Sequence, residues 1–176
     1  MKTIQTLIMT IGVLLMITSC EINDSVATTE LKELHVSLKK WNELKAKNDN
    51  SYVYSVSFAS WSGYGSATEI KVVDGLVVER KYNEYVINQA TGEQDITLVY
   101  TEDQAHLGTN HDGALPITID ELYNTCGKQY LVVSTQDNDV HFETSDIGMM
   151  NLCGYVPKGC MDDCFNGIMI KSFEWL

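Results

Sequence analysis

The sequence predicts an α+β fold, in which an N-terminal amphipathic helix packs on an antiparallel sheet, with one short second helix and a disulfide-stapled C-terminal loop. Three observations predict it. Apolar residues recur at steps of three and four between residues 30 and 47, the spacing of one helix face. Apolar and polar residues alternate over much of residues 51–100, as they do in strands. Four cysteines lie between residues 126 and 164.

The first 19 residues have the composition of a secretory signal peptide rather than of a folded element. Lys2 gives a short basic start, and an apolar run extends from Leu7 to Ile17. The run closes with Ile17-Thr18-Ser19-Cys20, which resembles the lipobox of bacterial lipoproteins. This resemblance implies that residues 1–19 are removed and that Cys20, as the new N-terminus, carries acyl chains such as palmitate.

A membrane-spanning anchor is the alternative for this segment. Residues 4–19 make a stretch of 16 that includes Gln5, Thr6 and Thr10, whereas a spanning helix needs about 20 mostly apolar residues. The segment is therefore short for a spanning helix, and the lipobox resemblance implies instead a lipid on Cys20 that attaches the protein to a membrane of the bacterial cell envelope, with its domain outside the cytoplasm. Two or three acyl chains are enough for stable attachment.

After the signal, the sequence predicts a flexible tether at residues 20–29 and a single domain at residues 30–176. The tether consists mostly of small and polar residues. Removing residues 1–19 takes away only Lys2 among the charges, so 12 − 1 = 11 lysines and arginines remain against 24 aspartates and glutamates. The resulting net charge of −13 argues against a nucleic-acid partner, whose phosphates need a basic surface. It also argues against electrostatic docking onto anionic lipid.

Residues 30–47 are predicted to form the amphipathic helix. Glu30 and Glu33 suit the positive end of the helix dipole, and Lys45 and Lys47 suit its negative end. The apolar face comprises Leu31, Leu34, Leu38, Trp41 and Leu44.

Four antiparallel strands are predicted to follow as a meander. The first covers residues 51–61, and the second is centred on residues 68–72. Asp74-Gly75 is a strong signal for a two-residue hairpin and leads into a third strand at residues 76–87. The fourth contains residues 96–100. A long irregular loop is expected at residues 102–116.

The C-terminal part begins with a short helix. Thr118 and Glu121 form a capping box, and the helix is expected to reach Cys126 and stop at Gly127. The sequence then predicts strands at residues 130–134 and 140–144, a cysteine-rich loop at residues 147–166, and a closing strand at residues 167–176.

The even number of cysteines after Cys20 predicts disulfide bonds, because the chain is expected to be exported. A zinc site is the alternative, but the spacing lacks paired C-x2-C knuckles. Four cysteines allow three connectivities. We expect Cys153 to pair with Cys160, because glycines and a proline between them allow the chain to reverse, and Cys126 to pair with Cys164.

Two groups of residues are candidate sites. The first is the loop pair His106 and His111 with Asp103 and Asp112, which are reasonable metal ligands; the alternative is a solvated polar loop. The second is a set of aromatic residues that would form a binding patch if they faced solvent together, or would otherwise pack in the core. Its members are Trp61, Tyr64, Tyr82 and Tyr85.

Residues 38–126 contain a helix that ends near a tryptophan and three short apolar segments, which are Tyr52-Val53-Tyr54-Ser55-Val56, Val72-Val73-Asp74-Gly75-Leu76-Val77-Val78 and Ile119-Asp120-Glu121-Leu122-Tyr123. Together they resemble a family of small bacterial envelope lipoproteins of uncharacterised function. The resemblance implies a similar α+β fold and supplies no catalytic residues.

The sequence thus favours a lipid-anchored, non-catalytic module that binds an envelope protein, peptide or glycan, or that has a structural role in the envelope, without a cofactor. It contains no Gly-x-Ser-x-Gly motif for a serine nucleophile. The alternative function is that of a metal-dependent enzyme or metal-binding protein that uses the His106/His111 loop.

Overall fold

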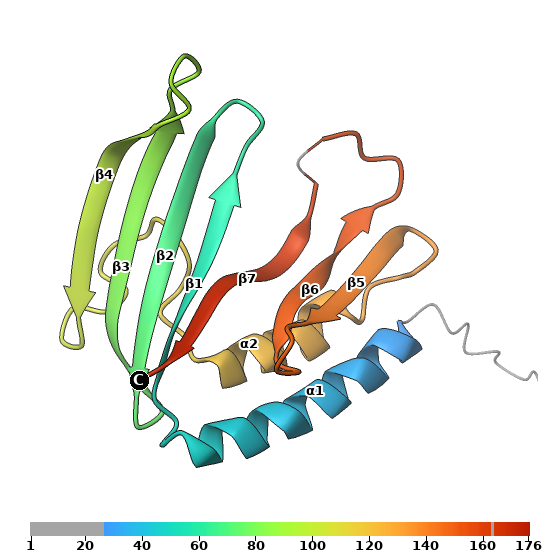
Figure 1. The fold of residues 1–176 in the computed structure, drawn as a ribbon. Coiled ribbons are helices and arrows are strands. Elements are labelled where there is room, and N and C mark those ends of the chain that lie inside the picture. The colour runs from blue at the N-terminus through green and yellow to red at the C-terminus, as the bar shows by residue number, and fades with distance from the viewer. Residues whose placement is uncertain (1–26, 163) are drawn as a thin grey trace, which may run out of the picture.

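The structure is a computed structural model that describes residues 27–162 and 164–176. The expected signal peptide and the expected lipidation site Cys20 lie outside the described residues, as does most of the expected tether. The elements are α1 (Thr28–Lys47), β1 (Tyr52–Ala59), β2 (Tyr64–Val73), β3 (Leu76–Ile87), β4 (Gln94–Asp103), α2 (Ile119–Thr125), a π-helical turn (Cys126–Tyr130), β5 (Asn138–Thr144), β6 (Met150–Pro157) and β7 (Asn166–Trp175). In the described part of the chain, the strands form one antiparallel seven-stranded sheet in the order β4-β3-β2-β1-β7-β6-β5, so the α+β prediction is confirmed (Figure 1).

Helix α1 begins at Thr28, two residues before the predicted start. Ala27, which the sequence placed in the tether, is only 4% exposed and belongs to the folded domain. On the inner face of the helix Leu34, Ser37 and Trp41 are buried, and Leu38 is partly buried. Ser37 was not expected there. Its hydroxyl forms hydrogen bonds with the Tyr123 hydroxyl at 2.6 Å and with the Gly148 carbonyl at 2.9 Å.

The predicted meander is confirmed as strands β1 to β4. Strand β3 occupies the predicted residues 76–87, and the hairpin before it turns at Asp74 and Gly75, whose φ angles are 50° and 78°. Positive φ at both central positions is the requirement of a type I′ turn. Side chains from β1 and β2 on one face of this sheet join a single hydrophobic core with those of both helices. The sheet contributes Tyr52, Tyr54, Ile70 and Val72 to this core, and the helices contribute Leu34, Trp41, Ile119 and Leu122.

Three predictions for the C-terminal part are wrong. The helix does not stop at Gly127, which lacks the positive φ of a glycine cap; the chain continues as the π-helical turn. Residues 130–134 are therefore not a strand, and Leu131 instead donates its backbone N–H to the Cys126 carbonyl at 3.1 Å. Residues 150–157, expected within a loop, form strand β6 between β5 and β7.

The tertiary contact that makes β6 a strand involves two glycines. Gly154 pairs with Gly167 of β7, and a Cβ atom on either glycine would lie within 3 Å of the other's backbone. The two strands can approach so closely only because both positions lack a side chain. Of the expected cysteine-rich loop, the described residues between β6 and β7 are 158–162 and 164–165.

The disulfides are Cys126–Cys153 and Cys160–Cys164, so the expected pairing is wrong. Cys153 lies in the extended β6, which moves the chain away from it at about 3.3 Å per residue. The residues between Cys153 and Cys160 therefore do not form the expected reversal. Cys126, at the end of α2, lies against β6 instead, and both Cys126 and Cys153 are fully buried.

Replacing Cys126 and Cys153 together by alanine is expected to lower the free energy of unfolding by about 3–4 kcal/mol, because the bond closes a long loop in the unfolded chain. The corresponding Cys160→Ala/Cys164→Ala variant is the matched control. Its short loop predicts a loss of about 2 kcal/mol or less. Denaturant unfolding monitored by circular dichroism measures both. A Cys153–Cys160 peptide in a non-reducing digest would contradict the observed connectivity.

Candidate binding cleft

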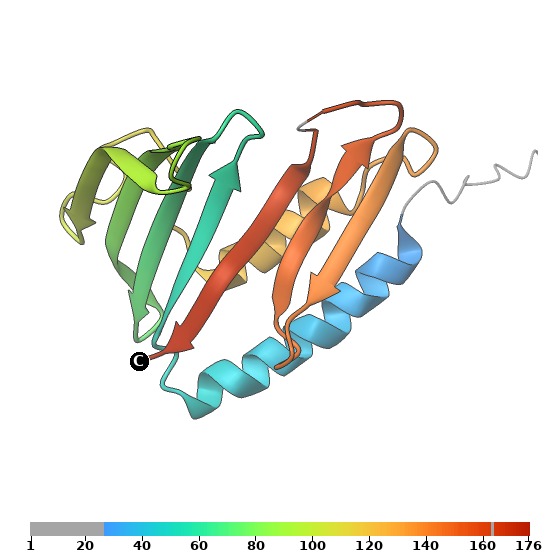
Figure 2. The ribbon, with the colours of Figure 1, turned by 45° about the horizontal axis from the view of Figure 1, so that its top comes forward.

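The sheet divides into two parts because β7 changes partners along its length. Its second half pairs with β1, from Tyr52 opposite Trp175 to Val56 opposite Ile170. Its first half pairs with β6 instead, and the register with β1 shifts between Ser55 and Val56. Such an irregularity bends a strand and increases its local twist. Beyond Val56, β1 and β7 consequently diverge, as Figure 2 shows.

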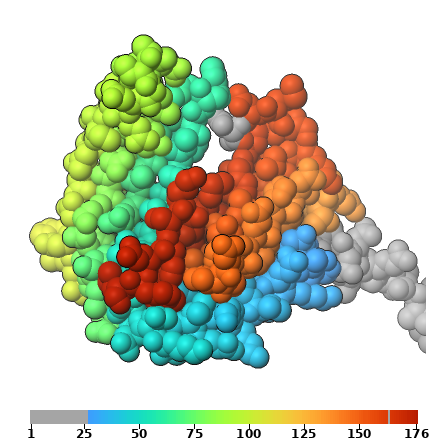
Figure 3. Space-filling model, viewed as in Figure 1, coloured from blue at the N-terminus to red at the C-terminus, as the bar shows by residue number. Residues whose placement is uncertain are grey.

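A cleft of about 860 Å³ lies where these strands separate. One wall comes from the end of β1 and from β2, and the other from β7 and the segment that links it to β6. Figure 3 shows the opening between these two parts of the molecule. Helix α2 contributes to the lining through Leu122. The large apolar side chains of the lining include Phe58, Leu122, Met161, Phe165, Ile168 and Met169.

Several of these apolar side chains are exposed to solvent. Phe58 is 49% exposed, Met169 is 41% exposed and Met161 is 96% exposed. An isolated exposed apolar residue is ordinary, whereas a group of them around a concavity is typical of an interaction site. Lys171 and Asp162 are the charged side chains in the lining, so the cleft carries charge of both signs.

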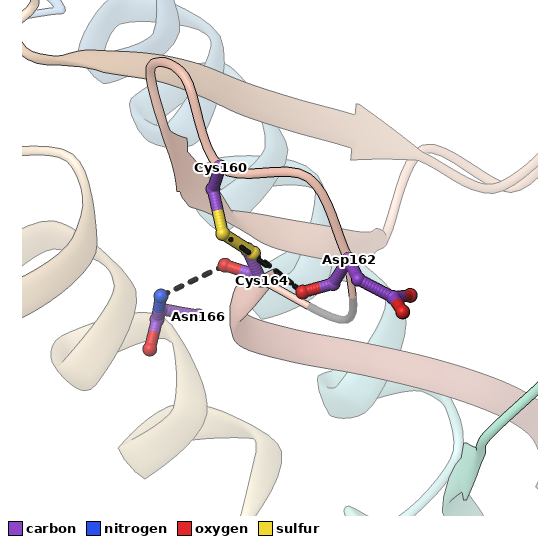
Figure 4. The surroundings of a disulfide bond; sticks show 4 residues. All are labelled: Cys160, Asp162, Cys164 and Asn166. Carbon is purple, nitrogen blue, oxygen red and sulfur yellow. Dashed lines mark hydrogen bonds between the residues drawn. A yellow bond between two sulfur atoms is a disulfide. The ribbon is translucent and has the colours of Figure 1, made fainter.

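The β6–β7 connection at the mouth of the cleft is held by the second disulfide. Figure 4 shows the Cys160–Cys164 bond, with its sulfur atoms close to the carbonyl oxygen of Asp162. The Asn166 side chain donates a hydrogen bond to the Cys164 carbonyl at 2.9 Å, which ties the disulfide to the start of β7. The sequence had identified these cysteines as candidates but had given them other partners.

The structure does not bring the four candidate aromatic residues onto one surface. Tyr82 is only 3% exposed, and Tyr85 lies over Gly65 on the opposite face of the sheet. Trp61 is 79% exposed in the turn between β1 and β2. Tyr64 is 38% exposed, with its ring 6.3 Å from that of Phe58. None of the four lines the cleft, but Tyr64 adjoins the lining residue Phe58, which was not among the candidate site residues.

The metal-ligand candidates are only partly brought together. The Asp103 carboxylate contacts His106 Nδ1 at 2.6 Å, and this hydrogen bond lowers the pKa of Asp103. His111 and Asp112 are exposed. Within residues 27–162 and 164–176, no three histidine, cysteine, aspartate or glutamate side chains are grouped so that they could hold one metal ion. The metal-binding alternative thus remains a prediction that rests on one histidine–aspartate pair.

A buried ion pair holds the loop after β4 against the sheet. Arg80 and Glu102 face each other across β3 and β4, are 1% and 2% exposed, and form a hydrogen bond of 3.0 Å. Arg80 also donates to the carbonyls of Asn110 and Asp112. Glu102 accepts hydrogen bonds from the backbone N–H groups of Gly108 at 2.8 Å and Asn110 at 2.7 Å.

Burial alone would raise the pKa of the Glu102 carboxyl, but the hydrogen bonds from Asn110, Gly108 and Arg80 outweigh it and lower the pKa to about 2. Arg80 and Glu102 therefore hold the loop after β4 in place through these hydrogen bonds. This loop places Gly113 and Ala114 at the cleft. Gly113 has a φ of 76°, and a Cβ atom there would collide with Tyr82 and Thr68.

The sequence contained a signal for this pair that was missed. Arg80 occupies the same face of β3 as Val78 and Tyr82, and Glu102 follows Leu98 and Tyr100 in the alternation of β4. Opposite charges at apolar positions of two neighbouring hairpin strands indicate a buried ion pair.

No family model matches this chain, and neither does any curated protein or solved structure among those compared. Helices long and apolar enough to cross a membrane do not occur in the described part of the chain. A functional assignment must therefore start from the cleft itself. The apolar side chains of the cleft can bury apolar groups of a ligand, and Asp162 and Lys171 can form polar contacts with it.

Proposed function

We propose that the chain is a lipid-anchored, non-catalytic binding module of the bacterial cell envelope, and that its ligand occupies the cleft between β1 and β7. The observation that carries this proposal is the group of exposed apolar side chains around an 860 Å³ cleft. A volume of this size is within the range of ligand sites. Leaving Phe58, Met161 and Met169 in water is unfavourable, and a bound ligand would remove their apolar surface from it.

The envelope location is supported by two features. The signal-like segment ends in Ile17-Thr18-Ser19-Cys20, and four further cysteines form two disulfides. Disulfides persist in exported proteins and are rare in the reducing cytosol. A lipid on Cys20 would hold the cleft near a membrane, where a ligand of the envelope would meet it.

Mass spectrometry of protein extracted from membranes is expected to show Cys20 as an acylated N-terminal residue, with residues 1–19 absent. In a Cys20→Ser variant the thiol that receives the lipid is gone, so the domain should no longer sediment with membranes. Retention of Met1 or an unmodified Cys20 in the wild-type protein would contradict lipid anchoring.

Photo-crosslinking in native envelopes is expected to label the ligand from inside the cleft. Phe58 would be replaced by benzoylphenylalanine, which keeps the aromatic ring and adds a photoreactive carbonyl. Val99, 64% exposed on the edge strand β4, gives the control position. We expect a discrete adduct from position 58 and none of the same mass from position 99.

Equal labelling at positions 58 and 99 would mean that the cleft has no preferred ligand. Absence of any adduct at position 58 would also overturn the proposal, provided that the substituted protein is folded and membrane-bound.

A further inference from the structure

We propose that the ligand is an extended segment of a partner polypeptide, which inserts between β1 and β7 as an added strand. This inference rests on the proposed function and specifies its ligand. Its basis is the chemistry of the two strand edges that form the cleft, because exposed strand edges recognise a polypeptide backbone.

Within residues 27–162 and 164–176, no strand lies between the two edges that line the cleft. After Val56 the ladder from β1 to β7 ends, and residues 57–59 pair with β2 alone within the described part of the chain. Residues 166–169 of β7 likewise pair with β6 alone. Every residue in a strand has an N–H and a C=O, and those directed away from the paired neighbour remain available.

The length of these edges sets the size of the inserted segment. Three residues of β1 and four of β7 have a described neighbouring strand on one side only. At about 3.3 Å per residue, they correspond to edges of about 10–13 Å. A strand of about three or four residues would span it. Because β1 and β7 run antiparallel to each other, the inserted strand is antiparallel to one and parallel to the other, a combination common in mixed sheets.

The side chains around the edges determine the pattern of the inserted segment. Successive side chains of a strand point to opposite faces of the sheet. One face of the cleft offers Phe58, Leu122 and Ile168, and the alternate positions of β1 and β7 offer Ser57 and Met169. The fitting segment therefore carries apolar side chains at every second position, directed toward α2, and more polar ones between them.

The same edges disfavour a lipid as the ligand. An acyl chain would fill the apolar space but would leave the facing backbone N–H and C=O groups without water or another partner, which is costly. A polypeptide strand satisfies these groups and buries the apolar side chains together.

The test uses random linear peptides displayed on phage, selected against the full mature, lipidated protein in detergent micelles. Selected peptides are synthesised in two forms, one unmodified and one methylated at alternate backbone nitrogens. Methylation removes N–H donors and leaves the side chains unchanged. We expect the methylated form to bind about tenfold more weakly or worse.

Variants locate the binding site. Phe58→Lys and Met169→Lys place a charge in the cleft at side chains that are 49% and 41% exposed, so the fold should tolerate them. Each is expected to lower peptide affinity by about tenfold or more. Val99→Lys is the matched control on β4 and should leave affinity unchanged; circular dichroism verifies that all three variants are folded.

Three results would overturn strand insertion: selection of no peptide, equal affinity of the methylated and unmodified forms, or insensitivity to both cleft variants. If no peptide is selected while position 58 crosslinks to an envelope lipid or glycan, the binding function stands and the polypeptide inference fails. If neither peptide binding nor crosslinking occurs, both fail.

Discussion

Replacing Trp41 with alanine is expected to lower the free energy of unfolding by about 3–5 kcal/mol. Trp41 is fully buried where α1 meets the sheet. Its ring stacks on Trp175 at 5.5 Å and meets the edges of Tyr52 at 5.2 Å and Phe173 at 5.9 Å. The indole N–H also donates to the Asp120 carboxylate at 3.3 Å. Alanine would leave a cavity that these rings cannot fill without leaving their own positions.

Trp61→Ala is the control for this prediction, because Trp61 is 79% exposed in a turn. Its loss should change stability by no more than about 0.5 kcal/mol. Urea unfolding followed by far-ultraviolet circular dichroism avoids dependence on tryptophan fluorescence. If the Trp41→Ala variant lost less than about 1 kcal/mol, α1 would not be docked on the sheet as described.

Replacing Arg80 with methionine is expected to cost about 3–5 kcal/mol, because it leaves the buried Glu102 carboxylate without its ionic partner. The carbonyls of Asn110 and Asp112 lose a donor at the same time. Lys81→Met makes the same change at the next residue of β3. The Lys81 side chain is 51% exposed and pairs with Glu69 and Glu79 at the surface, so its loss should cost about 1 kcal/mol or less. Similar losses in the two variants would contradict a buried role for Arg80.

The pH dependence of stability provides a second measurement of this ion pair. The pKa of Glu102 is lowered from 4.5 to about 2 in the folded protein. The contribution of the ionised Glu102 carboxylate to the free energy of unfolding is therefore complete above about pH 4.5. It is lost as the pH falls from there toward 2, because the unfolded chain takes up the proton first. A Glu102→Gln variant should be less stable than the wild type at neutral pH. Its free energy of unfolding should also decrease less than that of the wild type as the pH falls from about 4.5 toward 2. A parallel pH profile for variant and wild type would contradict the assignment.

Local sequence signals predicted the elements that local interactions determine. The helix at residues 30–47, the Asp74-Gly75 hairpin and the Thr118–Glu121 capping box all depend on neighbours within a few residues. Strand β6 depends instead on Gly154 meeting Gly167 of a strand that comes later in the chain. The alternation in β6 is interrupted at glycine and proline, which favoured a loop and led to the wrong disulfide pairing.

The cleft could not be predicted from the sequence because it results from β7 pairing with two different strands. The register shift after Ser55 brings Phe173 and Trp175 onto the core side together with Ile168 and Ile170. The sequence predicted one closing strand at residues 167–176 but contained no sign of where that strand leaves β1. Phe58 lies on the same face of β1 as Tyr52, yet nothing in the local sequence indicates that the sheet opens beside it.

Amide hydrogen exchange tests the central claim, that a ligand occupies the opening between β1 and β7, most directly. Under the proposed lipid anchoring, exchange would be compared for the protein in native envelope membranes and for the same protein purified in detergent. We predict slower exchange in the envelope for residues 57–59 and 166–169, with the exposed edge strand β4 unchanged as an internal reference. Identical exchange of residues 57–59 and 166–169 in both preparations would contradict occupation of the cleft.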